Sequence, residues 1–203
     1  MSPNPAGHRW TRFVLAGVVL GVMLFSVELV REAYVVEGFV MAANSMAPTL
    51  LRGDHILVSK LAYWSGAPRR SDIIAYRYPL DRSRIWIHRV IGIGGDTLQM
   101  QGNQLWLNGR QVHEPYILSG AGAGATASFC PYNYGCQPLN IPAAAYFVLG
   151  DNRNKSQDSR YWGLLKRELV VGRPIWIYWS RDPDTGRIRW ERVGKRVPHD
   201  PTG

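Results

Sequence analysis

The chain begins with one long apolar stretch, and the remainder alternates short apolar runs with polar turns. Residues 13–30 read FVLAGVVLGVMLFSVELV and carry a single charge, on Glu28. Because an α-helix rises about 1.5 Å per residue, this stretch is just long enough to cross the hydrocarbon core of a bilayer. The pattern predicts a transmembrane anchor over residues 13–31, after a short N-terminal segment 1–12.

The charges on either side of the apolar stretch predict its orientation. Arg9 and Arg12 precede it, whereas residues 28–32, ELVRE, mix both signs. The positive-inside rule therefore places the N-terminus in the cytoplasm and residues 32–203 outside, on a single-pass protein of the cell (inner) membrane. A cleaved secretory signal is the alternative, but ELVRE lacks the small residues of a cleavage site. Either interpretation takes the body of the chain out of the cytoplasm.

Beyond the anchor, the apolar runs are short, rich in β-branched residues, and bounded by Gly, Pro and Asn, which is typical of strands. Asn108-Gly109 is a tight-turn signal, and residues 161–168 offer at most one or two helical turns. The body is therefore expected to be mainly β. The expected strands cover residues 34–41, 55–59, 73–78, 84–93, 146–149, 169–179 and 187–193, with short hairpins over 97–112.

The net charge of +9 does not indicate a nucleic-acid partner. The basic residues are scattered along the chain, with one dense stretch at 181–196, and no nucleic-acid motif accompanies them. The basic tail is either simply solvated or lies near anionic lipid head groups.

Cys130 and Cys136 enclose a turn-rich Pro-Tyr-Asn-Tyr-Gly segment. In an oxidising compartment such a pair is expected to form a disulfide, with two free thiols as the alternative. A structural zinc site needs about four ligands, and no His or further Cys lies nearby in the sequence, so no metal is expected.

Three polar segments interrupt or follow apolar strands, and these carry the candidate chemistry. Residues 44–50, NSMAPTL, place Ser45 between a strand and a proline turn. Residues 84–90 place His88 within a strand, where an imidazole can act as a general base without special tuning. A purely structural histidine is the alternative. The third segment is residues 150–163, GDNRNKSQDSRYWG, whose density of polar groups suggests a site rather than a plain turn.

The ordered set of segments resembles the bacterial type I signal peptidases, from the anchor to about Ser180. The matching motifs are NSMAPTL followed by Gly53-Asp54, then SDIIAY, HRVIGIGGD and GDNRNKSQDSRYWG. The resemblance implies a mostly antiparallel β catalytic domain with a small inserted β subdomain, here residues 98–145. It also implies a serine endopeptidase that removes signal peptides from exported proteins without a cofactor.

The resemblance assigns Ser45 as the nucleophile and places His88 where the bacterial family has a lysine base. Eukaryotic and archaeal relatives carry histidine at that position, so His88 is expected to act as the general base. Histidine titrates near 6.5 rather than near 10.4, so it needs orientation and a defined tautomer more than desolvation. Some family members have a hydroxyl two residues before the nucleophile, where this chain has Ala43, so the oxyanion hole would use backbone N–H groups.

Asp158 and Ser156 match family positions that line the base, and either could fix the imidazole. Asp158 is the expected orienting carboxylate, unless Arg160 or Arg89 occupies it in an ion pair instead.

The implied partners are signal peptides of exported preproteins, with small residues at the first and third positions before the cut, together with membrane lipids. Two alternatives stay open: a peptidase specialised for a narrow substrate set, and an inactive homologue that binds signal peptides without cutting them. The sequence does not indicate the oligomeric state.

Overall fold

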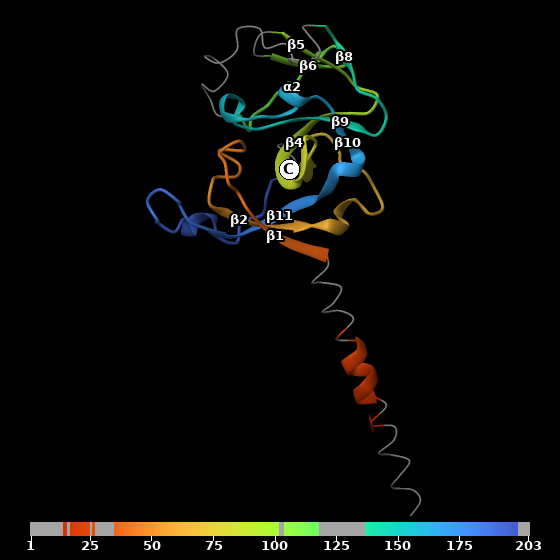
Figure 1. Ribbon diagram of the computed structural model, residues 1–203, viewed down its shortest axis with the longest axis vertical. Helices are drawn as coiled ribbons and strands as arrows, with labels where there is room; N and C mark the ends of the chain where they lie inside the picture. The colour runs from red at the N-terminus through yellow and green to blue at the C-terminus, as the bar shows by residue number, and fades with distance from the viewer. Residues whose placement is uncertain are drawn as a thin grey trace, which may run out of the picture. The chain divides into compact units, whose positions relative to one another are not determined.

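Two β-sheets make up the body of the chain in the computed structural model, which describes residues 14, 15, 17–24, 26, 35–101, 104–117 and 137–198 (Figure 1). The strand pairs with a defined register, such as β3 (Ile73–Tyr78) with β4 (Asp81–Ile93), are all antiparallel. The expected mainly β, antiparallel architecture is confirmed.

Within the described residues the larger sheet has seven strands, and a smaller sheet has four. The larger sheet runs in the order β1 (Val36–Val40), β2 (Asp54–Ser59), β11 (Val170–Ser180), β3, β4, β9 (Ala145–Leu149) and β10 (Leu165–Lys166). The smaller sheet runs in the order β7 (Arg110–Gln111), β6 (Gln104–Leu107), β5 (Thr97–Gln101) and β8 (Leu139–Asn140). The smaller sheet is thus built entirely from residues between β4 and β9.

The tight turn at Asn108-Gly109 is confirmed, because both residues adopt positive φ angles, 53° and 75°, as a type I′ hairpin turn requires.

The expected strand over 187–193 is wrong. Ile188 makes only an isolated bridge to Arg181, and Trp190–Arg192 form a 3-10 turn. That turn directs the Arg192 guanidinium inward to Asp54, a contact that continued β alternation would not provide.

The short helix of the third polar segment lies earlier than expected. It is α2 (Ser159–Trp162), begun by Asp158, whose carboxylate accepts a hydrogen bond from the Arg160 backbone N–H at the first turn. The chain then forms β10 and a 3-10 turn, Arg167–Leu169. An Asp at this helix-start position satisfies a backbone donor that the helix itself leaves unpaired.

Residues 17–24 of the predicted anchor are helical. Among the described residues, no helix has both the length and the apolar character needed to cross a bilayer. Cys130 and Cys136 lie outside the described residues, as does the N-terminal segment 1–12.

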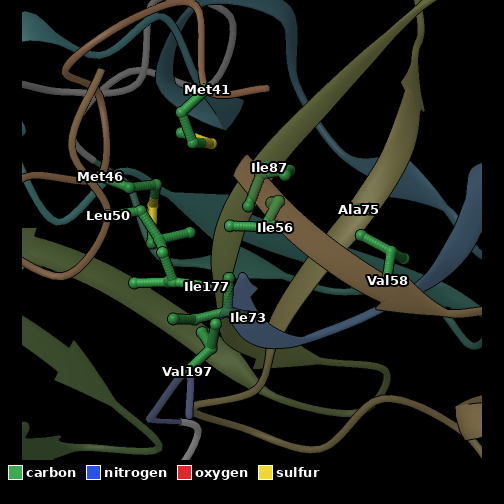
Figure 2. Close-up of a cluster of buried hydrophobic side chains, with 10 residues drawn as sticks. All are labelled: Met41, Met46, Leu50, Ile56, Val58, Ile73, Ala75, Ile87, Ile177 and Val197. Atoms are coloured by element: carbon green, nitrogen blue, oxygen red, sulfur yellow. The ribbon is translucent and has the colours of Figure 1, made fainter. Parts of the chain in front are cut away.

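One apolar core cluster fixes the loop that carries Ser45. Met46 and Leu50, on either side of that loop's turn, are fully buried. They pack with side chains from β2, β3, β4 and β11, and Figure 2 shows the cluster: Met41, Met46, Leu50, Ile56, Val58, Ile73, Ala75, Ile87, Ile177 and Val197. Burying a side chain of this size stabilises the fold by about 1.5–3 kcal/mol, so the loop is held by its own apolar residues.

Candidate active site

Ser45 lies in the loop between β1 and β2, and the third polar segment holds its backbone. The Ser45 carbonyl accepts a hydrogen bond from the Asn152 backbone N–H at 3.0 Å. The Asn152 side-chain amide donates to the neighbouring Asn44 carbonyl at 3.1 Å. Asn152 therefore joins two polar segments that are more than 100 positions apart in the sequence.

The reactive groups of Ser45 are not engaged by the rest of the site. Its side chain is half-buried, and among the described residues neither its hydroxyl nor its backbone N–H has a hydrogen-bond partner. A hydroxyl in this state can attack a carbonyl, and a backbone N–H beside it can donate to the oxyanion that forms.

His88 is buried in β4, with 2% of its surface exposed, and both ring nitrogens are paired. Nδ1 lies 2.6 Å from the Tyr76 hydroxyl, and Nε2 lies 3.2 Å from the Ser156 hydroxyl. The Ser156 hydroxyl donates its one hydrogen to Asp158 at 2.7 Å. Because that hydrogen is used, Ser156 must accept from Nε2–H, which leaves Nδ1 to accept from Tyr76. This network assigns the Nε2–H tautomer.

His88 and Ser45 are close but not bonded to each other. Both line one cavity of about 630 Å³, and among the described residues no hydrogen bond joins them. A Cβ placed on Gly150 would lie 2.3 Å from the Ser156 hydroxyl and 2.4 Å from the Ser45 carbonyl oxygen. Since Nε2 contacts this same hydroxyl, Nε2 is the ring nitrogen on the Ser45 side.

Burial controls the titration of His88. Desolvation of the ring, partly offset by the negative charges of Asp158 and Asp151, lowers the pKa of His88 to about 4. The imidazole is therefore neutral at neutral pH, the state that a general base requires.

Asp158 reaches His88 only through Ser156. Its fully buried carboxylate accepts hydrogen bonds from the Gly150 N–H (3.0 Å), the Ser156 hydroxyl (2.7 Å) and the Arg160 guanidinium (2.7 and 2.9 Å). Burial alone would raise the pKa of Asp158, but the hydrogen bonds and charge of Arg160 bring it below its ordinary value. The sequence did not decide whether Arg89 or Arg160 would form an ion pair with Asp158. In the structure, Arg160 forms this pair.

Arg89 instead forms a buried pair with Asp151. Its guanidinium makes two hydrogen bonds to that carboxylate, at 2.8 and 2.7 Å, and a third to the Ser71 carbonyl at 2.9 Å. Asp151 also accepts from the Thr49 hydroxyl at 2.5 Å. The residue after His88 is thus tied to the loop that follows Ser45. A bidentate, charge-assisted pair of this kind fixes geometry closely.

Sequence reasoning missed Tyr76, although a signal for it existed. In the register of β3 against β4, Ile74 lies opposite His88 and Tyr76 lies opposite Trp86. Tyr76 and His88 are therefore diagonal neighbours on one face of the sheet, a separation that aromatic side chains can span. Alternation along each strand predicts on which face of the sheet a side chain lies. Only the pairing register of β3 and β4 shows that Tyr76 and His88 are neighbours.

The cavity that Ser45 lines lies between two strand segments. One wall is the end of β1 with the residues after it, and another is the first half of β4, where pairing with β9 begins only at Arg89. Its lining is largely apolar, with a few polar and basic side chains: Phe39, Val40, Met41, Ala42, Ala43, Ser45, Arg84, Ile85, Trp86, Ile87, His88, Lys155 and Gln157.

A larger hollow of about 1110 Å³ lies elsewhere, bordered by Trp64, Trp162 and Arg167. It contains none of the residues proposed for catalysis, so size alone does not identify the reactive site. In the described parts of the chain, no three His, Cys, Asp or Glu side chains gather closely enough to hold a metal ion.

Comparison with known proteins gives a consistent set of matches. Residues 10–179 match the family described as signal peptidase, peptidase S26. Signal peptidase I from Bacillus caldolyticus is 37% identical over 180 residues, which cover 85% of this chain and 91% of that protein. Signal peptidase I from Leptolyngbya laminosa is 35% identical over 156 residues, covering 73% of this chain and 71% of that protein.

Signal peptidase I from Pseudomonas aeruginosa is 33% identical over 211 residues, covering 82% of this chain and 73% of that protein. The crystal structure of a signal peptidase I from Enterococcus faecalis matches with a TM-score of 0.43 at 31% identity, and covers 52% of this chain and 95% of that one.

Proposed function

This chain belongs to the signal peptidase S26 family and is a hydrolase, and from that premise we propose that it is a membrane-bound serine endopeptidase that removes signal peptides from exported preproteins. The observation that carries this proposal is that one cavity is lined both by Ser45, whose hydroxyl has no hydrogen-bond partner among the described residues, and by the neutral imidazole of His88.

In the proposed reaction, Ser45 Oγ attacks the scissile carbonyl while Nε2 of His88 takes its proton. The Ser45 backbone N–H, which has no partner among the described residues, donates to the oxyanion. The imidazolium then protonates the leaving amine, and an acyl-enzyme remains on Ser45. Water, deprotonated by the same imidazole, releases it. These steps need Nε2 unprotonated. Before attack, Nε2 therefore releases its proton to water in the cavity and Nδ1 takes up a proton from water, which converts the resting Nε2–H tautomer into the Nδ1–H tautomer with no net change of charge.

Membership of the family supports substrates with small residues at the first and third positions before the cut, and the apolar lining of the cavity suits such uncharged side chains. Residues 84–88 present a strand edge that β9 does not pair, and an extended peptide can add to such an edge by main-chain hydrogen bonds. Signal peptides of this small-x-small kind are therefore the proposed substrates.

The proposal also includes the placement of the chain. Residues 13–31 form a single membrane anchor with the N-terminus in the cytoplasm, supported by the apolar sequence and the preceding Arg9 and Arg12. The catalytic domain, including the inserted subdomain 98–145, lies outside. Within that insertion, Cys130 and Cys136 form a disulfide. Membrane lipids are partners of the anchor, and no cofactor takes part.

The test is cleavage of a preprotein with an Ala-x-Ala signal peptide by the full-length protein in detergent. Ser45→Ala and His88→Gln are each expected to lower kcat by at least 1000-fold, since nucleophile and base act as a unit. His55→Gln is the matched control, because His55 is half-buried outside the cavity, and it should retain wild-type kcat.

The outcomes separate the alternatives. Undiminished cleavage by Ser45→Ala or His88→Gln would overturn that residue's role. Failure of the wild type on general signal peptides, with cleavage of one dedicated substrate, would replace the broad activity by the specialised one.

A further inference from the structure

Tyr76 is a buried polar group that the proposed reaction has not yet used. Its side chain is fully buried in β3, and its hydroxyl lies 2.6 Å from Nδ1 of His88. Tyr146 belongs to the same buried cluster, but its hydroxyl makes no hydrogen bond with the described residues. The contact with His88 therefore distinguishes Tyr76 from an ordinary aromatic core residue.

The position on the imidazole that a third catalytic residue usually holds is the nitrogen away from the nucleophile. Here that nitrogen is Nδ1, because Nε2 faces Ser156 and the Ser45 loop. Asp158, the expected orienting group, lies behind Ser156 on the Nε2 side and is paired with Arg160. Tyr76 is the residue that contacts Nδ1.

We propose that Tyr76 is the positioning residue of the Ser45–His88 pair, and that its neutral phenol holds Nδ1 so that Nε2 is presented toward Ser45. This inference rests on the proposed function of His88 as the base. It assigns to a phenol the orienting part that a carboxylate plays in a Ser-His-Asp triad.

A phenol suits a ring that must exchange tautomers, because a hydroxyl both donates and accepts. In the resting state its hydrogen points to the Nδ1 lone pair. When Nε2 takes the proton from Ser45, Nδ1 carries the other hydrogen, and the phenol oxygen accepts from it. Tyr76 keeps its own proton in both states, since burial raises the pKa of this phenol far above its ordinary value.

The contact matters more when the ring is charged than when it is neutral. Hydrogen bonds to charged groups contribute about twice as much as those between neutral groups. Removing the phenol oxygen therefore weakens the transition state, where His88 becomes an imidazolium, more than the resting state. We expect Tyr76→Phe to lower kcat about tenfold and to change KM less than about twofold, because the residue does not line the cavity.

The experiment uses the full-length protein in detergent with ¹⁵N-labelled histidine. The signals of His88 are assigned by their loss in His88→Gln. In the wild type at neutral pH, Nε2 should be protonated and Nδ1 unprotonated but hydrogen-bonded. In Tyr76→Phe, the Nδ1 signal should move toward that of a free unprotonated nitrogen, with kcat reduced as stated. Tyr146→Phe, which removes a hydroxyl from the same cluster, should leave both the signals and kcat unchanged.

Two results would overturn the inference. One is a Tyr76→Phe protein with the wild-type Nδ1 signal and wild-type kcat. The other is a wild-type protein whose Nδ1 signal shows that this nitrogen is protonated or not hydrogen-bonded. This measurement does not depend on whether the variant folds. If His88→Gln retains activity, the proposed base is wrong, whereas the Nδ1 signals still decide whether Tyr76 holds the ring.

Discussion

The Arg192 guanidinium contacts both carboxylate oxygens of Asp54, which lies 138 positions earlier in the sequence and is fully buried. The same guanidinium donates to the Thr49 carbonyl at 2.9 Å. Asp54 also accepts from the Ser180 hydroxyl at 2.6 Å and the Leu51 N–H at 2.8 Å. The segment after β11 is thereby fastened to the turn that follows Ser45. Arg192 lies beyond the residues 10–179 that match the family.

Arg192→Ala is therefore expected to destabilise the protein and to loosen the nucleophile loop. Removing one partner of a buried ion pair leaves the other charge uncompensated, at a cost of about 3–5 kcal/mol. We expect the free energy of unfolding in urea to fall by about 3 kcal/mol, with lower kcat on the preprotein.

The matched control is Arg187→Ala, because Arg187 lies in the same segment with an exposed side chain. Surface substitutions of this kind usually change stability by less than about 0.5 kcal/mol. Equal unfolding free energies for the two variants would show that the Asp54 contact does not hold this segment.

The strands were predictable because short apolar runs bounded by turn residues are typical of buried strands. In β3, whose observed bounds Ile73–Tyr78 match the expected ones, the first four residues are all buried. The tail over 187–193 has an alternating pattern, but its conformation follows from the ion pair of Arg192 with Asp54. A contact between residues so distant in sequence is invisible to local periodicity.

The candidate site was also only partly predictable from the sequence. Ser45, His88 and Ser156 stand in polar segments that sequence could single out, and the structure places them together. The partner of Asp158 could not be decided, since Arg89 and Arg160 are both plausible from the sequence. Tyr76 was missed because its contact with His88 depends on how β3 and β4 pair with each other. The residue pattern of a single strand does not reveal that register.

The midpoint of the acid limb of the pH–rate profile is expected to lie well below the ordinary pKa of histidine. Protonation removes the base, so kcat should fall as pH drops through the pKa of His88, which burial lowers to about 4. An unperturbed histidine, near 6.5, would be mostly protonated at pH 5. We therefore expect kcat to stay level from pH 8 to about pH 5 and to decline about tenfold per unit below about pH 4.

This profile is measured at saturating substrate, with tryptophan fluorescence recorded at each pH to show that the protein remains folded. A limb centred near 6.5 in folded protein would contradict the burial of the ring during the reaction. A limb that persists unchanged in any residual activity of His88→Gln would assign it to another group.

Gly150 lies close to both the Ser45 carbonyl and the Ser156 side chain, which contacts His88. A Cβ there would lie 2.4 Å from the Ser45 carbonyl oxygen and 2.3 Å from the Ser156 hydroxyl, far inside van der Waals contact. The first of these is backbone and cannot rotate away, so Gly150→Ala must displace the loop of the nucleophile. A misplacement of about 1 Å can reduce a rate about 100-fold.

We therefore expect Gly150→Ala to lower kcat/KM on the preprotein by about 100-fold or more, although the substitution removes no reactive group. Gly66→Ala is the matched control, because a Cβ at Gly66 would meet nothing within 4 Å. Retention of wild-type kcat/KM by folded Gly150→Ala would mean that the close approach of Gly150 to the Ser45 carbonyl is not needed for the reaction. Equal losses in both variants would point to a general effect of replacing glycine rather than to this contact.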